Sequence, residues 1–369
     1  MLLIKNGRIH NAIEPEAFVA DILVENGKIA DIKQNIEIDG AEIYDANGYD
    51  VYPGFIDVHT HIGMFGFSGE ATKDDVEKYD NCTPNHRALD AVNIYEETFL
   101  EAAKAGVTCA CVGPGSVACM AGSHMAVKTY GENRIVADPV AMKIAFGENL
   151  KKTRVQTLTT RATVAATIRE IIQRAKEYDK KIKNDEKYEY DPKLEALLGV
   201  VRGEIPLKAH AHRKDDILTA IRIAEECGVK LTLEHTTDSE GIEDLLSEKG
   251  YPIAVGPYFY QPKKAENRMS SPKNAVSLIE KGCHVSVMTD SPIVATQYLP
   301  ASAALLMREG LSEFEALKTI TINPARHLGI ENRVGSIEIG KDADLVICKG
   351  CPLQITVKPT AVFINGEKI

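Results

Sequence analysis

A His-x-His pattern occurs twice in this chain, as the pairs His59/His61 and His210/His212. Each pair follows a short, mostly apolar run. Residues i and i+2 of a strand point to the same face, about 6.5–7 Å apart at Cα. Two imidazoles placed in this way can bind one metal ion. Polar residues at a loop entrance would explain a single pair, but that explanation weakens when the pattern recurs.

Two further apolar runs end in a residue of the same kind. His235 follows Leu231–Glu234, and Asp290 follows His284–Thr289. Four run ends therefore carry histidine, histidine, histidine and aspartate. Imidazole together with carboxylate suits zinc, manganese, iron or cobalt. The recurrence at four separate places favours a metal site over chance.

The middle of the chain alternates between short apolar runs and amphipathic stretches. The runs predict strands at Val51–Val58, Val107–Val112, Val140–Ala145, Pro206–Ala209, Lys230–Glu234, Ile253–Val255 and His284–Thr289, with an eighth expected in Met125–Tyr130. Helical spacing predicts helices at Ile94–Ala105, Thr163–Tyr178, Asp215–Cys227 and Asn274–Lys281. This alternation favours an α/β fold, a (β/α)8 TIM barrel, whose catalytic groups lie at the C-terminal ends of the strands. The histidines and Asp290 fall at those ends.

The two ends of the chain have a different pattern of short strands and tight turns. Strands with Asn-Gly turns are predicted in Leu2–Ile9 and Asp21–Ile29, and again in Gly335–Gly340, Leu345–Cys348 and Val362–Gly366. Neither end has enough surface for a core alone. We therefore expect residues 1–50 and 330–369 to form one small β-sandwich beside a catalytic barrel of residues 51–329.

Composition narrows the class of partner. The net charge of −10 argues against nucleic acid or an anionic membrane as the main partner. No apolar run approaches the roughly 20 residues of a membrane span, and the apolar start is too short for a signal peptide. The eight cysteines then indicate reduced thiols in the cytoplasm. We expect a small-molecule substrate; a homo-oligomer is compatible with the sequence, which does not specify the oligomeric state.

Three segments resemble the amidohydrolase superfamily. Pro53–His61 (PGFIDVHTH) is similar to its opening signature, and Thr321–Arg326 and Gly335–Val346 are similar to its closing segments. The resemblance spans essentially the whole chain and is closest to the branch related to imidazolonepropionase. It implies a (β/α)8 barrel with a flanking β-sandwich. It also implies metal ligands or catalytic groups on the first, sixth and eighth strands, at His59, His61, His235 and Asp290.

The fifth-strand pair departs from the family pattern. His210 matches the single fifth-strand histidine of the family, so the resemblance assigns the metal to it. His212 stands where deaminases and imidazolonepropionase-like members carry an acidic residue that transfers protons. An imidazole there puts both of those reactions in doubt. His212 would polarise the substrate carbonyl, contact a charged group of the substrate, or serve only as a structural residue.

Lys143 lies at the centre of the apolar run Ala141–Ala145. A fully buried lysine is rare unless it is paired or modified. In binuclear relatives, a fourth-strand lysine is carboxylated by carbon dioxide and bridges two metals. That modification needs a neutral amine, which burial favours by lowering the pKa. The alternative is an ion pair with an acid such as Glu148. Lys143 thus decides between one metal ion and two.

The remaining candidates are weaker. His124, Tyr258, Tyr260, Arg202 and Arg213 follow or flank strands and are candidates for substrate contacts. The other histidines are predicted to be structural: His10, His86, His284 and His327.

We expect a metal-dependent amidohydrolase that cleaves a C–N amide bond of a small substrate, of the dipeptide or N-acyl amino acid type. One or two divalent ions, zinc first among them, would acidify a bound water to hydroxide, which attacks the amide carbon. Asp290 would carry the proton to the leaving nitrogen, and a metal or His212 would stabilise the oxyanion. The alternatives are a deaminase or cyclic amide or imide hydrolase, and a non-catalytic scaffold that has lost its ligands.

Overall fold

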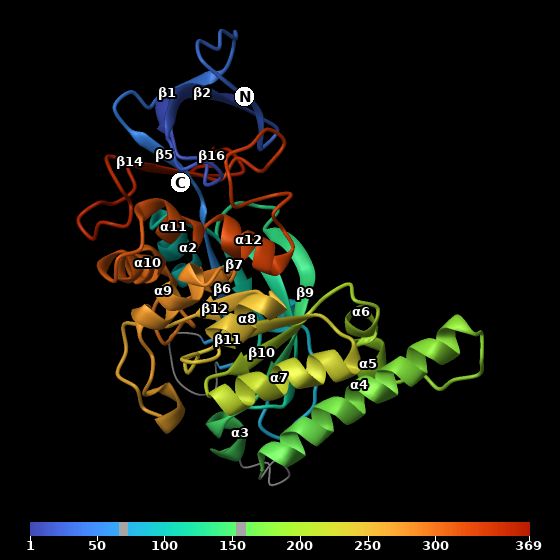
Figure 1. The fold of residues 1–369 in the computed structure, drawn as a ribbon. Coiled ribbons are helices and arrows are strands. Elements are labelled where there is room, and N and C mark those ends of the chain that lie inside the picture. Colours follow the sequence, from blue (N-terminus) through green and yellow to red (C-terminus); the bar gives the residue numbers. More distant parts are fainter. Residues whose placement is uncertain (66–72, 153–159) are drawn as a thin grey trace.

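The computed structural model describes residues 1–65, 73–152 and 160–369. These residues form two eight-stranded sheets, one closing into a barrel and one built from both ends of the chain (Figure 1). Helices surround the barrel, and the terminal sheet lies at one end of the molecule, where the first and last segments of the chain run side by side. No helix in the described ranges is long and apolar enough to cross a membrane.

The barrel strands follow one another in chain order. They are β6 (Phe55–Thr60), β7 (Val107–Val112), β8 (Met120–Lys128), β9 (Ile135–Ala145), β10 (Leu207–Ala211), β11 (Leu231–His235), β12 (Ile253–Val255) and β13 (Val285–Val287). Backbone hydrogen bonds from Val287 to Thr319 (2.9 Å) and from Ile56 to Ile320 (2.8 Å) place the segment 319–320 between the last strand and the first. The barrel is therefore nearly closed, and the ends of β6 and β13 are brought together.

The predicted eighth strand exists as β8, but it runs antiparallel to both β7 and β9. A parallel strand needs a crossover of about a dozen residues or more. The connections at 113–119 and 129–134 are shorter and contain no helix. The molecule is therefore an α/β barrel of eight strands, and the regular (β/α)8 pattern is not confirmed in this part of it.

Most helices lie between the later strands. The described helices are α1 (Ala88–Ala91), α2 (Glu97–Lys104), α3 (Glu148–Lys152), α4 (Arg161–Lys183), α5 (Pro192–Glu195), α6 (Leu198–Val201), α7 (Lys214–Cys227), α8 (Glu243–Lys249), α9 (Pro272–Glu280), α10 (Leu299–Arg308), α11 (Glu313–Lys318) and α12 (Ile322–Leu328), with 3-10 turns η2 (Ala265–Asn267) and η3 (Thr296–Tyr298). The four predicted helices correspond to α2, α4, α7 and α9, with shifted ends. For example, α4 begins after Thr160, whose side chain caps the amide of Thr163.

The terminal sheet draws strands from both ends of the chain. Its order is β16 (Glu367–Lys368), β15 (Ala361–Ile364), β14 (Leu345–Cys348), β5 (Asp50–Pro53), β1 (Leu2–Ile9), β2 (Phe18–Glu25) and β3 (Lys28–Lys33), with β4 (Glu42–Asp45) on β1. An apolar cluster of its own lies under this sheet. One residue separates β5 from β6, so the sheet leads directly into the first barrel strand. The division into domains at residues 50 and 330 stays a prediction.

One terminal strand was predicted wrongly. Gly335–Gly340 forms no strand, because both glycines have positive φ angles (95° and 92°) that bend the chain. By contrast, the predicted Asn-Gly turn is confirmed, since Asn26 and Gly27 have φ of 50° and 76° and join β2 to β3 as an antiparallel hairpin.

Candidate metal centre

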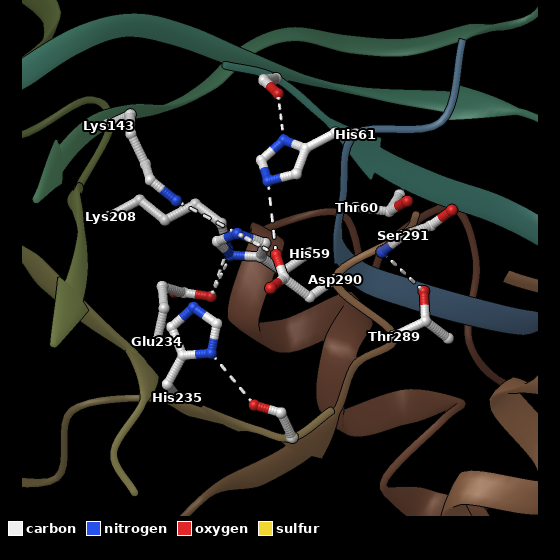
Figure 2. A network of polar contacts seen from close by, with 12 residues as sticks. His59, Thr60, His61, Lys143, Lys208, Glu234, His235, Thr289, Asp290 and Ser291 are labelled. Carbon is white, nitrogen blue, oxygen red and sulfur yellow. Dashed lines mark hydrogen bonds and ion pairs between the residues drawn. The ribbon is translucent and has the colours of Figure 1, made fainter. Parts of the chain in front are cut away.

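The predicted ligands converge at the ends of the barrel strands (Figure 2). Two groups have side-chain ligand atoms that all lie within 4.8 Å of one another. One group is His59, His235 and Asp290, and the other is His210, His212 and His235. Because His235 belongs to both, the two groups form one continuous cluster.

The first-strand pair presents its Nε2 atoms to Asp290. The Oδ1 atom of Asp290 lies 3.6 Å from Nε2 of His59 and 3.3 Å from Nε2 of His61. On the far side of each ring, Nδ1 of His61 donates to the carbonyl of Gly113 (2.6 Å) and Nδ1 of His59 to Glu234 (2.9 Å). With Nδ1 engaged as a donor, each Nε2 carries the lone pair that a metal requires.

The third ligand depends on an unusual backbone. His235, at the end of β11, has a φ of 72°, and Asp290 has a φ of 50°, both in the left-handed region that L-residues rarely adopt. Nδ1 of His235 donates to the carbonyl of Gly256 (3.0 Å), and its buried Nε2 has no partner within residues 1–65, 73–152 and 160–369. Such strain persists where the surrounding structure requires it, often at functional sites.

His210 provides further evidence that the cluster suits a cation. Both of its ring nitrogens are buried and lack a hydrogen-bond partner among the residues that the structure describes. Unpaired buried polar atoms are costly. Burial lowers the pKa of His210 well below its ordinary value, so the ring is neutral, as a metal ligand must be. The donor set and its orphaned nitrogens therefore fit a divalent metal.

Lys143 is buried, as predicted, and lies inside the same cluster. Its side chain is fully buried on β9, and Nζ is 3.1 Å from Nε2 of His59. Burial lowers the pKa of this amine to about 8. The alternative ion pair with Glu148 is not formed among the described residues; one carboxylate oxygen of Glu148 accepts instead from the amide of Glu266 (3.1 Å).

His212 lies with the ligands rather than in the apolar core. Its ring centroid is 4.2 Å from that of His235, and Nδ1 contacts Oγ1 of Thr237 at 2.7 Å. Its role in catalysis stays a prediction.

The weaker candidates divide into two groups. His124 is buried in the barrel with its ring 5.8 Å from that of His59. Both of its nitrogens, and the buried hydroxyl of Tyr258, have no hydrogen-bond partner among the described side chains and backbone. Arg202 and Arg213 instead pair with Asp179 (2.8 Å) and Asp215 (2.9 Å) on the helices. The structure thus does not bring the two arginines to the cluster.

Sequence reasoning missed Glu234 and Lys208, which lie buried beside the cluster. The carboxylate of Glu234 accepts a hydrogen bond from Nδ1 of His59, and Nζ of Lys208 lies 2.9 Å from the same carboxylate. His327, expected to be structural, contacts this carboxylate too. The sequence did contain a signal, because Lys208 and Glu234 are charged residues in otherwise apolar runs. Alternate residues of a strand share a face, so Lys208 points to the same side of β10 as His210, and Glu234 to the same side of β11 as Thr232.

The model of the amidohydrolase family matches residues 51–369 of the chain. The chain belongs to this family. It is therefore a hydrolase that acts on C–N bonds, in a family whose substrates are small molecules and whose members are typically metal-dependent.

Relatives of known structure and name extend this assignment. A solved amidohydrolase from Thermotoga maritima is 38% identical, with a TM-score of 0.95 over 100% of this chain and 99% of that one. The dihydroorotase of Aquifex aeolicus is 25% identical over 94% of this chain and 89% of its own length. Amidohydrolase tasK of Hapsidospora irregularis is 27% identical over 95% of this chain, which spans only 40% of that protein. The imidazolonepropionase-related branch is not confirmed by these matches.

Proposed function

We propose that the protein is a metal-dependent hydrolase that opens a small cyclic amide. The observation that carries the proposal is the convergence of neutral imidazoles and one carboxylate at the strand ends, with nitrogens of His210 and His235 that have no hydrogen-bond partner in the described part of the chain. A scaffold relative would be expected to lose these residues, and this chain keeps them. The cyclic amide is supported by the dihydroorotase relative, which matches nearly the whole chain.

Two metal positions fit the residues. His59, His61 and Asp290 would hold one ion, and His210 and His235 the other, with zinc the first choice for such donors. Lys143 lies against this cluster and would join the two ions as a carboxylated lysine. When bound, a divalent metal supplies a water acidic enough to attack a carbonyl near neutral pH.

Asp290 is the residue proposed to move the proton. Burial raises the pKa of its carboxyl group, but the nearby rings of His61 and His235 outweigh this and keep the pKa below its ordinary value. The group is therefore ionised and can accept a proton from the attacking water, then release it to the leaving nitrogen. His212 is placed to stabilise the oxyanion or to contact a charged group of the substrate.

The competing substrate classes make different demands. Dipeptides and N-acyl amino acids, the first expectation, would use the same residues, but the dihydroorotase relative favours a cyclic amide. Deamination is disfavoured because His212 stands where an acid is needed. In a cyclic amide, the leaving nitrogen stays tethered after cleavage, so ring opening gives a single product; the proton transfer by Asp290 is the same as for a linear amide.

The test is a substrate panel on zinc-loaded protein. Dihydropyrimidines and hydantoins, dipeptides, N-acyl amino acids and aminopurines would be compared by chromatography of the products and by ammonia release, with Asp290→Asn as the inactive control. We expect ring opening without ammonia release. Cleavage of dipeptides or N-acyl amino acids alone would overturn the cyclic-amide proposal and leave the metal site standing.

A further inference from the structure

The carboxylate of Glu234 is buried and engaged by four side chains. Oε2 accepts from Nδ1 of His59 (2.9 Å) and from Nζ of Lys208 (2.9 Å). Oε1 accepts from Nε2 of His327 (3.0 Å) and from Oγ1 of Thr232 (2.9 Å). The side chain of Glu234 is completely buried, so all of these contacts are made away from solvent.

These contacts join separate parts of the barrel behind one proposed metal ligand. His59 belongs to β6, Lys208 to β10, Glu234 to β11 and His327 to α12. Figure 2 shows the side chains of Glu234 and Lys208 directed towards the ring of His59. Nζ of Lys208 also donates to the carbonyl of Val58 (3.1 Å), next to His59 in the chain. The carboxylate is thus tied to both the ring and the backbone of the first strand.

The charges around Glu234 explain why it can be buried. A lone carboxylate at this depth would be strongly disfavoured. Nζ of Lys208 lies 2.9 Å from Oε2 and Nε2 of His327 lies 3.0 Å from Oε1, so both carboxylate oxygens have polar partners in addition to His59. The carboxylate accepts from Nδ1–H of His59, which fixes the tautomer whose Nε2 is free to bind a metal.

We infer that Glu234 is the positioning residue for His59, and that Lys208 and His327 hold its carboxylate in place for that purpose. The inference rests on the proposed metal centre. Glu234 touches neither metal nor substrate in this arrangement and acts through His59. A buried ion pair is by itself weak evidence for stability, whereas a carboxylate that bonds the far nitrogen of a metal-binding histidine typically strengthens metal binding by 10–100-fold.

The experiment measures metal affinity independently of turnover. Zinc affinity would be determined by competition with a chromophoric chelator for the wild type and for Glu234→Gln, and the visible spectrum of cobalt-loaded protein would report ligand geometry. We expect about 10–100-fold weaker zinc binding in Glu234→Gln, with an altered cobalt spectrum.

A matched control lies elsewhere in the barrel. Lys128 is fully buried on β8 and pairs with Asp344 (2.5 Å) and Asp342 (3.2 Å), neither of which belongs to the cluster. Asp344→Asn also removes a carboxylate from a buried ion pair, and it should leave zinc affinity and the cobalt spectrum unchanged. Equal loss of affinity in both variants would show a general effect of broken ion pairs and would overturn the inference.

A second variant guards against misfolding. Glu234→Gln leaves Lys208 charged and unpaired, whereas Glu234→Gln with Lys208→Met removes both charges. If the double variant unfolds at the wild-type temperature and still binds zinc about tenfold or more weakly, the positioning role stands. Wild-type affinity in either folded variant would overturn it. A wild-type protein that retains no stoichiometric metal would instead refute the proposed function, and this inference with it.

Discussion

Replacing Lys143 with methionine should change how the stability of the metal-free protein depends on pH. Lys143 is fully buried, and burial lowers the pKa of its amine from 10.5 to about 8. Between these two values the unfolded chain binds a proton that the folded protein does not. Stability therefore rises as the pH is raised through this window. Methionine has a side chain of similar length and no charge, so this contribution is absent from Lys143→Met.

The size of this stability effect follows from the pKa shift of Lys143. Each pKa unit corresponds to about 1.4 kcal/mol, so the charged amine destabilises the folded wild type by about 3 kcal/mol at pH 7. At pH 10 most of that penalty is gone. The difference in unfolding free energy between the variant and the wild type should therefore shrink by about 2–3 kcal/mol between pH 7 and pH 10.

The assay is denaturant unfolding of chelator-treated protein at several pH values. Titrating groups away from Lys143 contribute equally to both proteins and cancel in the difference; the thiol of Cys111, whose pKa responds to the charge of Lys143, is an exception. The variant should be the more stable protein at neutral pH, and the two curves should approach each other above pH 8. Parallel pH profiles would refute the reasoning, because they would mean that Lys143 titrates equally in the folded and unfolded chains.

Three further outcomes test the metal centre. Asp290→Asn should lower kcat by about 10²–10⁴-fold, measured by steady-state hydrolysis of the substrate found in the panel, and near-normal turnover would contradict its proton-transfer role. His212→Asn should lower kcat by about 10²-fold with zinc content unchanged if His212 stabilises the oxyanion; loss of metal by mass spectrometry would show that it is a ligand instead. Removing metal with a chelator should abolish activity. Zinc with bicarbonate should restore more activity than zinc alone if Lys143 is carboxylated, and equal recovery would speak against that modification.

The ligand positions could be predicted because strand periodicity and barrel topology act together. Polar residues after successive apolar runs must meet at one rim when the strands share a direction, and the structure brings His59, His210, His235 and Asp290 together there. The direction of β8 could not be predicted in this way, since a short apolar run has the same pattern whichever way it runs. The left-handed backbone that aims His235 into the cluster is equally invisible in the sequence, because only a small fraction of non-glycine residues, histidine included, adopt a positive φ.

Two lysines in the barrel interior show where sequence reasoning ends. Lys143 and Lys208 are neighbours in the register of β9 and β10, both fully buried in mostly apolar strands. Lys208 lies 2.9 Å from the carboxylate of Glu234, whereas Lys143 forms no ion pair within the described part of the chain and lies against His59. A paired ammonium can remain charged and hold its partner in place, while an unpaired one is driven towards the neutral amine that carbon dioxide can modify. Glu234 thus separates two otherwise similar lysines: Lys208 bonds its carboxylate behind the proposed metal centre, whereas Lys143 lies against His59, where we propose that carbon dioxide modifies it.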